Sequence, residues 1–372
     1  MSILLRILLV LLSCLPMLAC AEPSIVLEGS NAVFGSTDIA VGISFPPFSD
    51  SSQMSFTVSE LKKMSIGRMR IAIDWRDREP KQGKFYWGPM DLRMQTAKDN
   101  GISVFLTILS LAPDWALLPA GSDGACIMDE QALKSFIEAL VLRYDNIDKI
   151  QFGNEWETEH EEGTGYADTE SLKKFVIYNN ILFDAVQNHS PNTKVVLGGL
   201  TSTYPLVEFF TGKGSCPDFS GLRLARGVTI DKLNSKLARS KLEYDSKGIR
   251  QNIDYVFEHA QYDMLDIHLY DDAENWPSYV SVLPKDKPIL VSEFGGPNSE
   301  FENTSSSYQA QRMNHYIDAI EKLPIVEAYY FKLVDSPTSY HKDSGLFFSS
   351  LRAKPARTVF MRRLSVQLPE LR

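Results

Sequence analysis

Short apolar runs rich in β-branched residues recur along the whole chain, and each run is bounded by Gly, Pro or Asp. Apolar residues occupy both faces of these runs, which is typical of strands in a parallel sheet that helices cover on each side. The expected strands are Asp38–Phe45, Arg68–Trp75, Ser103–Leu111, Lys149–Trp156, Lys194–Thr201, Met264–Tyr270, Pro288–Gly295 and Val326–Leu333.

Helical patterns, with apolar residues three or four positions apart, lie between these runs. The expected helices are Ser55–Ser65, Asp91–Asn100, Asp129–Arg143, Thr169–His189, Gly248–Ala260, Ser307–Leu323 and Ala353–Leu364. Because strand and helix alternate eight times, the sequence predicts an α/β fold, a single (β/α)8 TIM barrel over residues 22–372. The longest connection, Ser202–Lys247, is expected to be partly ordered and to cover the site.

Charge and glycine patterns exclude several classes of protein. The 372 residues include 38 Lys and Arg against 47 Asp and Glu, a net charge of −9. Since no run of Lys or Arg occurs, a nucleic-acid partner is not expected, and a neutral or weakly charged partner fits better. No glycine-rich phosphate loop opens an expected helix, so no dinucleotide or other cofactor is expected.

The first residues have the pattern of an export signal. Arg6 supplies a positive start, Ile7–Leu12 is an apolar run, and Ala19-Cys20-Ala21 offers a small-residue cleavage site. Met1–Ala21 is therefore expected to be a signal peptide, with the mature chain periplasmic or secreted. In the alternative, Cys20 becomes a lipid-modified N-terminus. No later segment approaches the ~20 uncharged apolar residues that a membrane-spanning helix needs.

Two cysteines remain outside this signal region. Cys14 lies inside the signal and Cys20 at its edge, which leaves Cys126 and Cys216. In an exported protein two cysteines can form one disulfide, and the alternative is two free thiols. Both lie in loops at the carboxyl end of the expected barrel, so a bridge between them is sterically conceivable.

Candidate chemistry lies where the expected strands end. Barrel enzymes place their catalytic groups at the carboxyl ends of the strands, because these ends converge on one mouth. The polar residues at these ends are Arg70, Asp74, Asn154, Glu155, His268, Tyr270 and Glu293. Two glutamates across such a mouth suit glycosidic hydrolysis, in which one carboxylic acid protonates the leaving oxygen. The other carboxylate attacks the anomeric carbon or activates water, and retaining enzymes hold the pair ~5–5.5 Å apart.

Several motifs resemble those of clan A glycoside hydrolases. Gly153-Asn154-Glu155-Trp156 and Val291-Ser292-Glu293-Phe294-Gly295 resemble the strand-four and strand-seven signatures of the clan. The segment from Arg68 to Phe85 resembles the second βα unit of families 39, 42 and 5, and Pro113-Asp114-Trp115-Ala116 resembles the turn after strand three. Together the motifs are most similar to family 39-like members.

The resemblance implies a role for each matching residue. It implies a retaining glycosidase with Glu155 as general acid/base and Glu293 as nucleophile. Asn154 would bind the 2-hydroxyl of the sugar, and His268 would help to shape the site. Arg70 and Tyr270 would keep Glu293 ionised. Clan members commonly carry a Trp on strand eight beneath the sugar, whereas this chain reads Tyr329-Tyr330-Phe331-Lys332-Leu333. Phe331 or Lys332 would then take that place.

Other interpretations stay open beside this one. Trp115 and Trp156 could stack on sugar rings or simply pack within loops. The run Glu157–Glu162 contains metal-ligand residue types, but it is expected to be solvated loop surface, and no metal site is expected. A catalytically silent polysaccharide-binding barrel is the second functional candidate. A metal-dependent amidohydrolase is the third, and the absence of a His-x-His pair from Asp38–Phe45 disfavours it.

Overall fold

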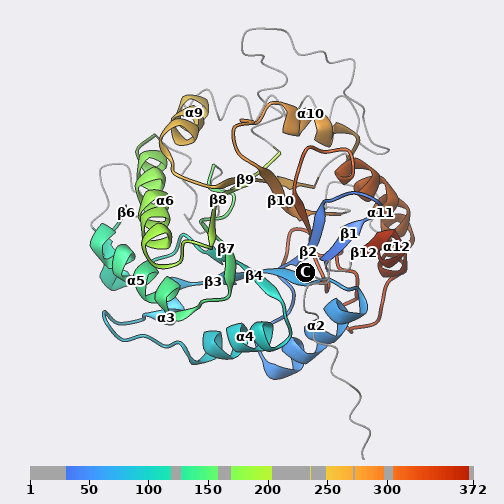
Figure 1. Ribbon diagram of the computed structural model, residues 1–372, viewed down its shortest axis with the longest axis horizontal. Helices are drawn as coiled ribbons and strands as arrows, with labels where there is room; N and C mark the ends of the chain where they lie inside the picture. Colours follow the sequence, from blue (N-terminus) through green and yellow to red (C-terminus); the bar gives the residue numbers. More distant parts are fainter. Residues whose placement is uncertain are drawn as a thin grey trace, which may run out of the picture.

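The computed structural model describes residues 31–118, 127–157, 169–202, 235, 249–270, 273–296 and 305–367. A ring of eight parallel strands forms its centre (Figure 1). These strands are β2 (Ala40–Ser44), β3 (Arg68–Ile73), β4 (Ser103–Ile108), β7 (Ile147–Phe152), β8 (Lys194–Leu200), β9 (Met264–Leu269), β10 (Ile289–Phe294) and β11 (Glu327–Tyr330). Strand β11 pairs with β10 on one side and with β2 on the other, so the sheet closes on itself. The predicted TIM barrel is confirmed.

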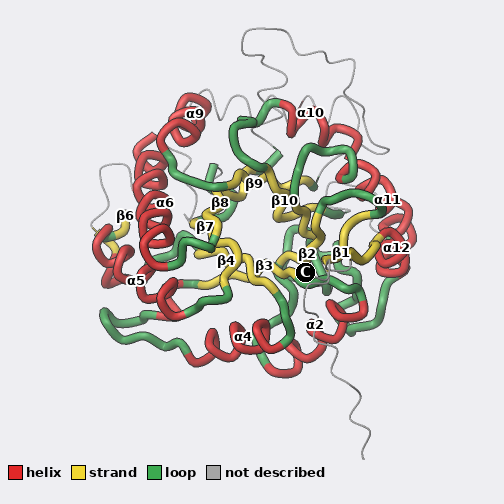
Figure 2. Tube along the Cα trace, in the orientation of Figure 1, coloured by secondary structure: helices red, strands yellow, loops and turns green. Residues whose placement is uncertain are grey.

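Helices surround the strands as an outer layer (Figure 2). They are α2 (Ser51–Lys63), α3 (Trp75–Arg78), α4 (Gly88–Asp99), α5 (Glu130–Arg143), α6 (Thr169–His189), α9 (Ile249–His259), α10 (Trp276–Ser281), α11 (Ser306–Ile320) and α12 (Pro355–Arg363), with short 3-10 turns at η1 (Asp114–Ala116) and η3 (Ala273–Asn275). Several begin at side-chain caps, in which Asp50, Asp129 and Ser305 accept a hydrogen bond from a backbone N–H of the first turn. These caps fix where the helices start after the preceding strand and loop.

Two small pairs of strands lie outside the barrel and were not predicted. Strand β1 (Asn31–Phe34) pairs antiparallel with β12 (Leu364–Gln367), so the two ends of the described chain lie side by side. Strand β5 (Leu117–Leu118) pairs antiparallel with β6 (Ile127–Met128) after strand β4. Such short segments leave too few positions for a hydrophobic period to appear in the sequence.

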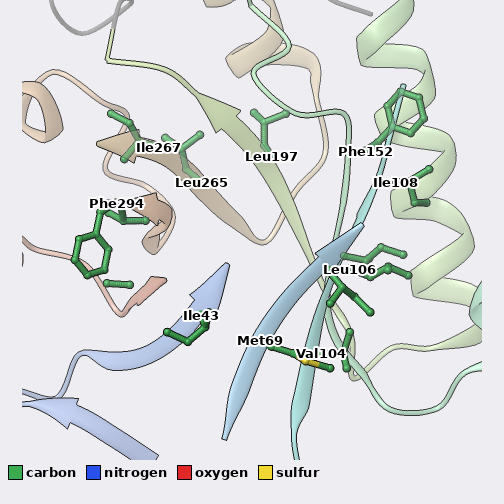
Figure 3. Packing of buried hydrophobic residues seen from close by; sticks show 14 of the residues in the cluster. Ile43, Met69, Val104, Leu106, Ile108, Phe152, Leu197, Leu265, Ile267 and Phe294 are labelled. Carbon is green, nitrogen blue, oxygen red and sulfur yellow. The ribbon is translucent and has the colours of Figure 1, made fainter. Parts of the chain in front are cut away.

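The outer faces of the barrel strands pack against the helices (Figure 3). Phe152 of β7, for example, lies against Phe175 and Tyr178 of α6, with ring centroids 6.3 and 5.8 Å apart. All three rings are 0–1% exposed. Burying each such ring stabilises the fold by about 1.5–3 kcal/mol, so this layer holds the strands in place beneath the site.

A separate apolar cluster fills the inside of the barrel. It consists of Phe105, Val196, Met264, Leu290 and Tyr329, one residue from each of five strands. The ring of Tyr329 crosses β2 at Gly42, where a Cβ atom would lie 2.3 Å from the ring carbons. Only glycine permits that approach. The interior is therefore packed, and polar chemistry is confined to the ends of the barrel.

Some predictions concern residues outside the described part of the chain. The expected signal peptide Met1–Ala21, both Cys126 and Cys216, and nearly all of Ser202–Lys247 lie there. Among the described residues, no helix has the length and apolar character needed to cross a membrane.

Candidate active site

Two glutamates face each other at the carboxyl end of the barrel. Glu155 follows β7, and Glu293 is the fifth residue of β10. One carboxylate oxygen of each, together with a ring nitrogen of His268, lie within 4.8 Å of one another. The side chain of Glu293 is 5% exposed and that of Glu155 is 26% exposed. The two carboxyls therefore share one space, with Glu155 on its more open side.

Glu293 is held by a hydrogen-bond donor on each oxygen. Arg70 donates from Nη1 to Oε1 at 2.5 Å, and the hydroxyl of Tyr270 donates to Oε2. Arg70 is fully buried, and it also donates to Thr107 Oγ1 at 3.0 Å and to Asn154 Oδ1 at 2.7 Å. Burial and the charge of Glu293 raise the pKa of Tyr270 well above its ordinary value, so the phenol remains a donor.

Glu155 accepts a hydrogen bond from His268, whose Nδ1 lies 2.9 Å from Oε1. The other ring nitrogen, Nε2, lies 3.1 Å from Ser292 Oγ. Ser292 gives its single hydroxyl proton to Asp266 Oδ2 at 2.6 Å, so its oxygen can only accept from His268. A chain of hydrogen bonds thus runs from the buried Asp266 to the carboxyl of Glu155.

His268 carries a positive charge in this arrangement. Burial alone would lower the pKa of its imidazole, but the carboxylates of Glu293, Asp266 and Glu155 raise that pKa to about 10. Burial would likewise raise the pKa of Asp266, yet the positive charges of His268 and Arg70 and the hydrogen bond from Ser292 hold it below the usual range. In this arrangement both ring nitrogens of His268 act as donors, one to Glu155 and one to Ser292.

An irregularity in β10 lets the neighbouring side chains of Ser292 and Glu293 both face the inside of the barrel. The register against β9 shifts between Leu290 and Glu293, and the register against β11 shifts between Val291 and Phe294. Consecutive residues of a regular strand point to opposite faces, so without the shift only one of these two side chains would face inward. Ser292 also donates its backbone N–H to Asp266 Oδ1 at 2.7 Å, which fixes the irregular segment.

Gly199 supports the backbone of Glu155 from the neighbouring strand. It has a φ of +80°, and a Cβ atom there would lie 2.4 Å from the backbone nitrogen of Glu155. Its own N–H donates to Asp266 Oδ2 at 3.0 Å. Glu155 itself has a φ of +48°, a left-handed conformation that is uncommon for a non-glycine residue. Close packing against Gly199 and the bond to His268 hold it there.

Glu157 is buried, which corrects the expectation that the run Glu157–Glu162 is solvated. The residue is 1% exposed, and its Oε1 accepts from the backbone N–H of Thr201. Its Oε2 has no hydrogen-bond partner in the described part of the chain. Burial raises the pKa of Glu157 to about 7, against the opposing bonds from Thr201. The remaining residues of the run lie outside the described ranges.

Three other candidates make contacts with residues other than the carboxyl pair. Asp74 caps α3 by accepting from the backbone N–H of Arg76 at 2.9 Å. Trp156 is 0% exposed and stacks on Phe175 with ring centroids 4.7 Å apart, so the structure places it in the core rather than along a sugar subsite. Trp115 is partly buried and donates from Nε1 to the backbone oxygen of Glu79 at 2.9 Å.

Phe331 and Lys332 follow strand β11, where the clan commonly has its Trp. The Phe331 ring lies edge-on to Tyr270 at 5.6 Å and to Phe45 at 6.3 Å between centroids. Phe45 in turn lies beneath the guanidinium of Arg70, 4.5 Å from its ring centroid. Phe331 therefore belongs to the aromatic wall beside the donors of Glu293.

Sequence reasoning proposed Arg70, Asn154, Glu155, His268, Tyr270 and Glu293, and the structure brings all six together. It missed Asp266 and Ser292, which lie beside the Nε2 side of His268. Asp266 was detectable, because it is an acidic residue two positions before His268 in an otherwise apolar strand. Ser292 was not, since its direction depends on the register shift in β10.

Several solved structures that resemble this chain in fold are glycoside hydrolases. The exo-β-1,4-mannosidase Op5Man5 from Opitutaceae bacterium strain TAV5 superposes with a TM-score of 0.60 at 14% identity, over 87% of this chain and 58% of that one. An enzyme titled GH5_18 from Bifidobacterium longum subsp. longum ATCC 55813 gives 0.59 at 11% identity, over 88% and 78% of the two chains.

A family 39 glycoside hydrolase from Bacteroides cellulosilyticus WH2 gives a TM-score of 0.50 at 14% identity, covering 87% of this chain and 62% of that one. No family model matches the sequence, and no curated protein matches it either. The chain therefore has the fold of clan A glycoside hydrolases. Since different families share that fold at similarly low identity, the likeness does not single out family 39.

Proposed function

We propose that this chain is a retaining glycoside hydrolase that cleaves an O-glycosidic bond of a poly- or oligosaccharide. The proposal rests chiefly on one observation, the carboxyl oxygens of Glu155 and Glu293 within 4.8 Å of each other at the mouth of the barrel. Retaining enzymes hold their carboxyl groups ~5–5.5 Å apart, whereas inverting enzymes leave ~6.5–9.5 Å for a water molecule. The close spacing supports double displacement.

In the first step Glu293 attacks the anomeric carbon. Arg70 and Tyr270 each donate to one of its two oxygens, which holds the carboxyl group in a fixed orientation. Glu155 enters this step in its protonated form, and it gives its proton to the leaving oxygen as the bond from the sugar to that oxygen breaks. Asn154 accepts from Arg70 through Oδ1, so its NH2 group is the end that would donate to the 2-hydroxyl of the sugar.

In the second step Glu155 changes its role from acid to base. The glycosylated Glu293 has lost its negative charge, and Glu155 is now a carboxylate that His268 stabilises through Nδ1. It takes a proton from water, the resulting hydroxyl attacks the anomeric carbon, and Glu293 is released as a carboxylate. The sugar leaves with its original anomeric configuration.

Replacement of each glutamate tests these roles. Glu293→Gln should lower kcat at least about 1,000-fold, because an amide cannot form the glycosyl intermediate. Glu155→Ala should lose most activity on poor leaving groups, and azide should restore it on a nitrophenyl glycoside with a glycosyl azide of retained configuration as product. The exposed Glu258→Gln serves as a control that keeps wild-type rates. Full activity in both site variants would overturn the assignment.

Two further measurements separate this proposal from its alternatives. A 2-fluoro sugar inactivator followed by peptide mapping should label the peptide that contains Glu293. A silent polysaccharide-binding barrel would instead bind glycans on an array and release no reducing ends from any of them. We also propose that the chain is exported through Met1–Ala21, and sequencing the N-terminus of the secreted protein distinguishes cleavage before Glu22 from lipid modification at Cys20.

A further inference from the structure

Lys332 has an environment that is unusual for a lysine. The residue is 5% exposed, although it follows strand β11 at the mouth of the barrel. Among the residues that the structure describes, its ammonium makes no hydrogen bond and no ion pair within 4.0 Å, and it lies 5.0 Å from the centroid of the Phe331 ring. Burial lowers its pKa to about 8, so the group is still mainly charged at pH 7.

The position of Lys332 relates it to the proposed nucleophile. The ring that it faces, Phe331, packs edge-on against Tyr270, which donates to Glu293. The charge of Glu293 acts on the Lys332 ammonium. Lys332 thus lies on the same side of the barrel mouth as Glu293, the proposed nucleophile.

The nearby carboxylates do not neutralise Lys332. Asp335 is already paired with Lys354, whose Nζ lies 2.7 Å from its Oδ1. Glu293 is already paired with Arg70 and hydrogen-bonded by Tyr270. Within the described ranges, Lys332 is therefore a positive charge without a counter-ion of its own beside the site. The net charge of −9 does not cancel it, because exposed charges more than ~10 Å away are screened by salt.

We propose that Lys332 binds a carboxylate of the substrate, so that the enzyme acts on a glycan that contains uronic acid residues. This inference rests on the proposed glycosidase function and deepens it. A carboxylate is the group that a partly dehydrated ammonium binds best, since it brings the opposite charge and accepts a hydrogen bond from the N–H groups. The substrate of this site is then acidic, which differs from the neutral or weakly charged partner that overall composition favoured.

Matched pairs of polymers test the inference. Uronate-containing polysaccharides, such as glucuronoxylan, polygalacturonate, alginate and hyaluronan, are each assayed beside a carboxyl-reduced form, in which borohydride treatment of the activated ester has made the uronate a neutral hexose. The wild-type enzyme should cleave one native polymer about 10- to 100-fold faster, in kcat/KM, than its reduced form. Lys332→Met should lose that preference and cleave both forms at similar rates, while the exposed Lys322→Met keeps it.

The outcomes separate this inference from the proposed function. Equal cleavage of native and reduced polymers by the wild type would overturn the role of Lys332 and leave the glycosidase intact. Cleavage that depends on sulfate esters, measured on a sulfated glycan and its desulfated form, would also overturn it. Absence of cleavage on all polymers, with no fluoro-sugar labelling of Glu293, would overturn both. If Lys332→Met does not fold, the comparison of the two polymer forms by the wild type still decides.

Discussion

Burial disfavours the charged form of two titratable residues near the mouth, His268 and Glu157. Their protonation states nevertheless differ, because their partners differ. His268 is completely enclosed, yet it stays charged because Glu293, Asp266 and Glu155 surround it. Glu157 is enclosed to a similar degree and accepts hydrogen bonds from Thr201, but no positive charge is among the causes of its pKa shift and the negative charge of Glu155 lies nearby. A buried group keeps its charge only where opposite charge or several donors compensate for lost water.

This difference predicts how Glu157 affects stability. Its pKa rises from 4.5 to about 7 on folding, so the folded state binds more protons than the unfolded state between these values. The contribution of Glu157 to stability is then most favourable below pH 4.5, and it declines as the pH rises to about 7. Glu157→Gln removes the penalty. It should raise the free energy of unfolding at pH 8 by about 1–2 kcal/mol and leave it nearly unchanged at pH 4.5.

Urea unfolding at the two pH values measures this effect. Glu258→Gln, at a site where the side chain is 78% exposed, provides the matched control and should change stability little at either pH. A gain for Glu157→Gln of equal size at both pH values would contradict the titration argument. It would mean that packing, rather than charge, sets the cost of this carboxyl.

At the scale of elements, the strands could be predicted from the sequence and their ends could not. All eight barrel strands overlap the expected apolar runs, because burial between helices and barrel interior demands apolar residues on both faces. The expected strand Lys149–Trp156 ends at Phe152, and Val326–Leu333 ends at Tyr330. Asn154 and Glu155 lie just beyond the first of these ends and Phe331 just beyond the second, where hydrogen bonds rather than hydrophobic period fix the backbone.

The support behind the carboxyl pair depends on contacts between elements. Asn154 and Glu155 stood out in the sequence as a polar pair after an apolar run, but Gly199 did not. Its importance comes from the approach of β8 to the backbone that follows β7. Such distances between segments far apart in the chain are not encoded in any local pattern, so single-sequence reasoning cannot find them.

Gly199→Ala should therefore damage both stability and activity. The added methyl group would lie 2.4 Å from the nitrogen of Glu155, and the position has a φ of +80°. We expect a loss of at least about 2 kcal/mol in the free energy of unfolding and at least about a tenfold loss in kcat, because Glu155 is displaced. Two controls separate backbone strain from the close contact. Gly83 has a φ of +69°, but no atom lies within 4 Å of an added Cβ, which makes Gly83→Ala a test of strain alone. Gly88 has no positive φ and also no atom within 4 Å of an added Cβ, so Gly88→Ala tests neither cause.

These variants are compared by urea unfolding and by kcat on one cleaved substrate. Gly83→Ala should cost only the conformational strain, about 1 kcal/mol, and Gly88→Ala should cost nothing measurable. Neither should alter kcat. If Gly83→Ala lowers kcat as much as Gly199→Ala does, the close contact with Glu155 is not the cause.

At the scale of the whole molecule, the barrel interior divides into three levels. Charged groups lie at the amino end, where Lys149 pairs with Glu327 at 2.8 Å and Tyr329 donates to the same carboxylate at 2.9 Å. The apolar cluster of Phe105 and its neighbours fills the middle. The carboxyl pair lies above it, where Arg70 rests on the ring of Phe105 at 5.4 Å. The apolar level separates the two sets of charges, so they should act independently.

Lys149→Met tests that independence. Its side chain is 5% exposed, and its loss leaves Glu327 buried with Arg68, 3.7 Å away, as the remaining cation. Removing one partner of a buried ion pair costs about 3–5 kcal/mol, so the free energy of unfolding should fall by roughly that amount. Lys98→Met breaks an exposed pair with Asp145 and should cost less than about 1 kcal/mol. Both variants should retain wild-type kcat/KM below their unfolding temperatures, since the apolar level shields the site. A decrease in kcat/KM that accompanies the loss of stability would instead show that the two ends of the barrel are coupled.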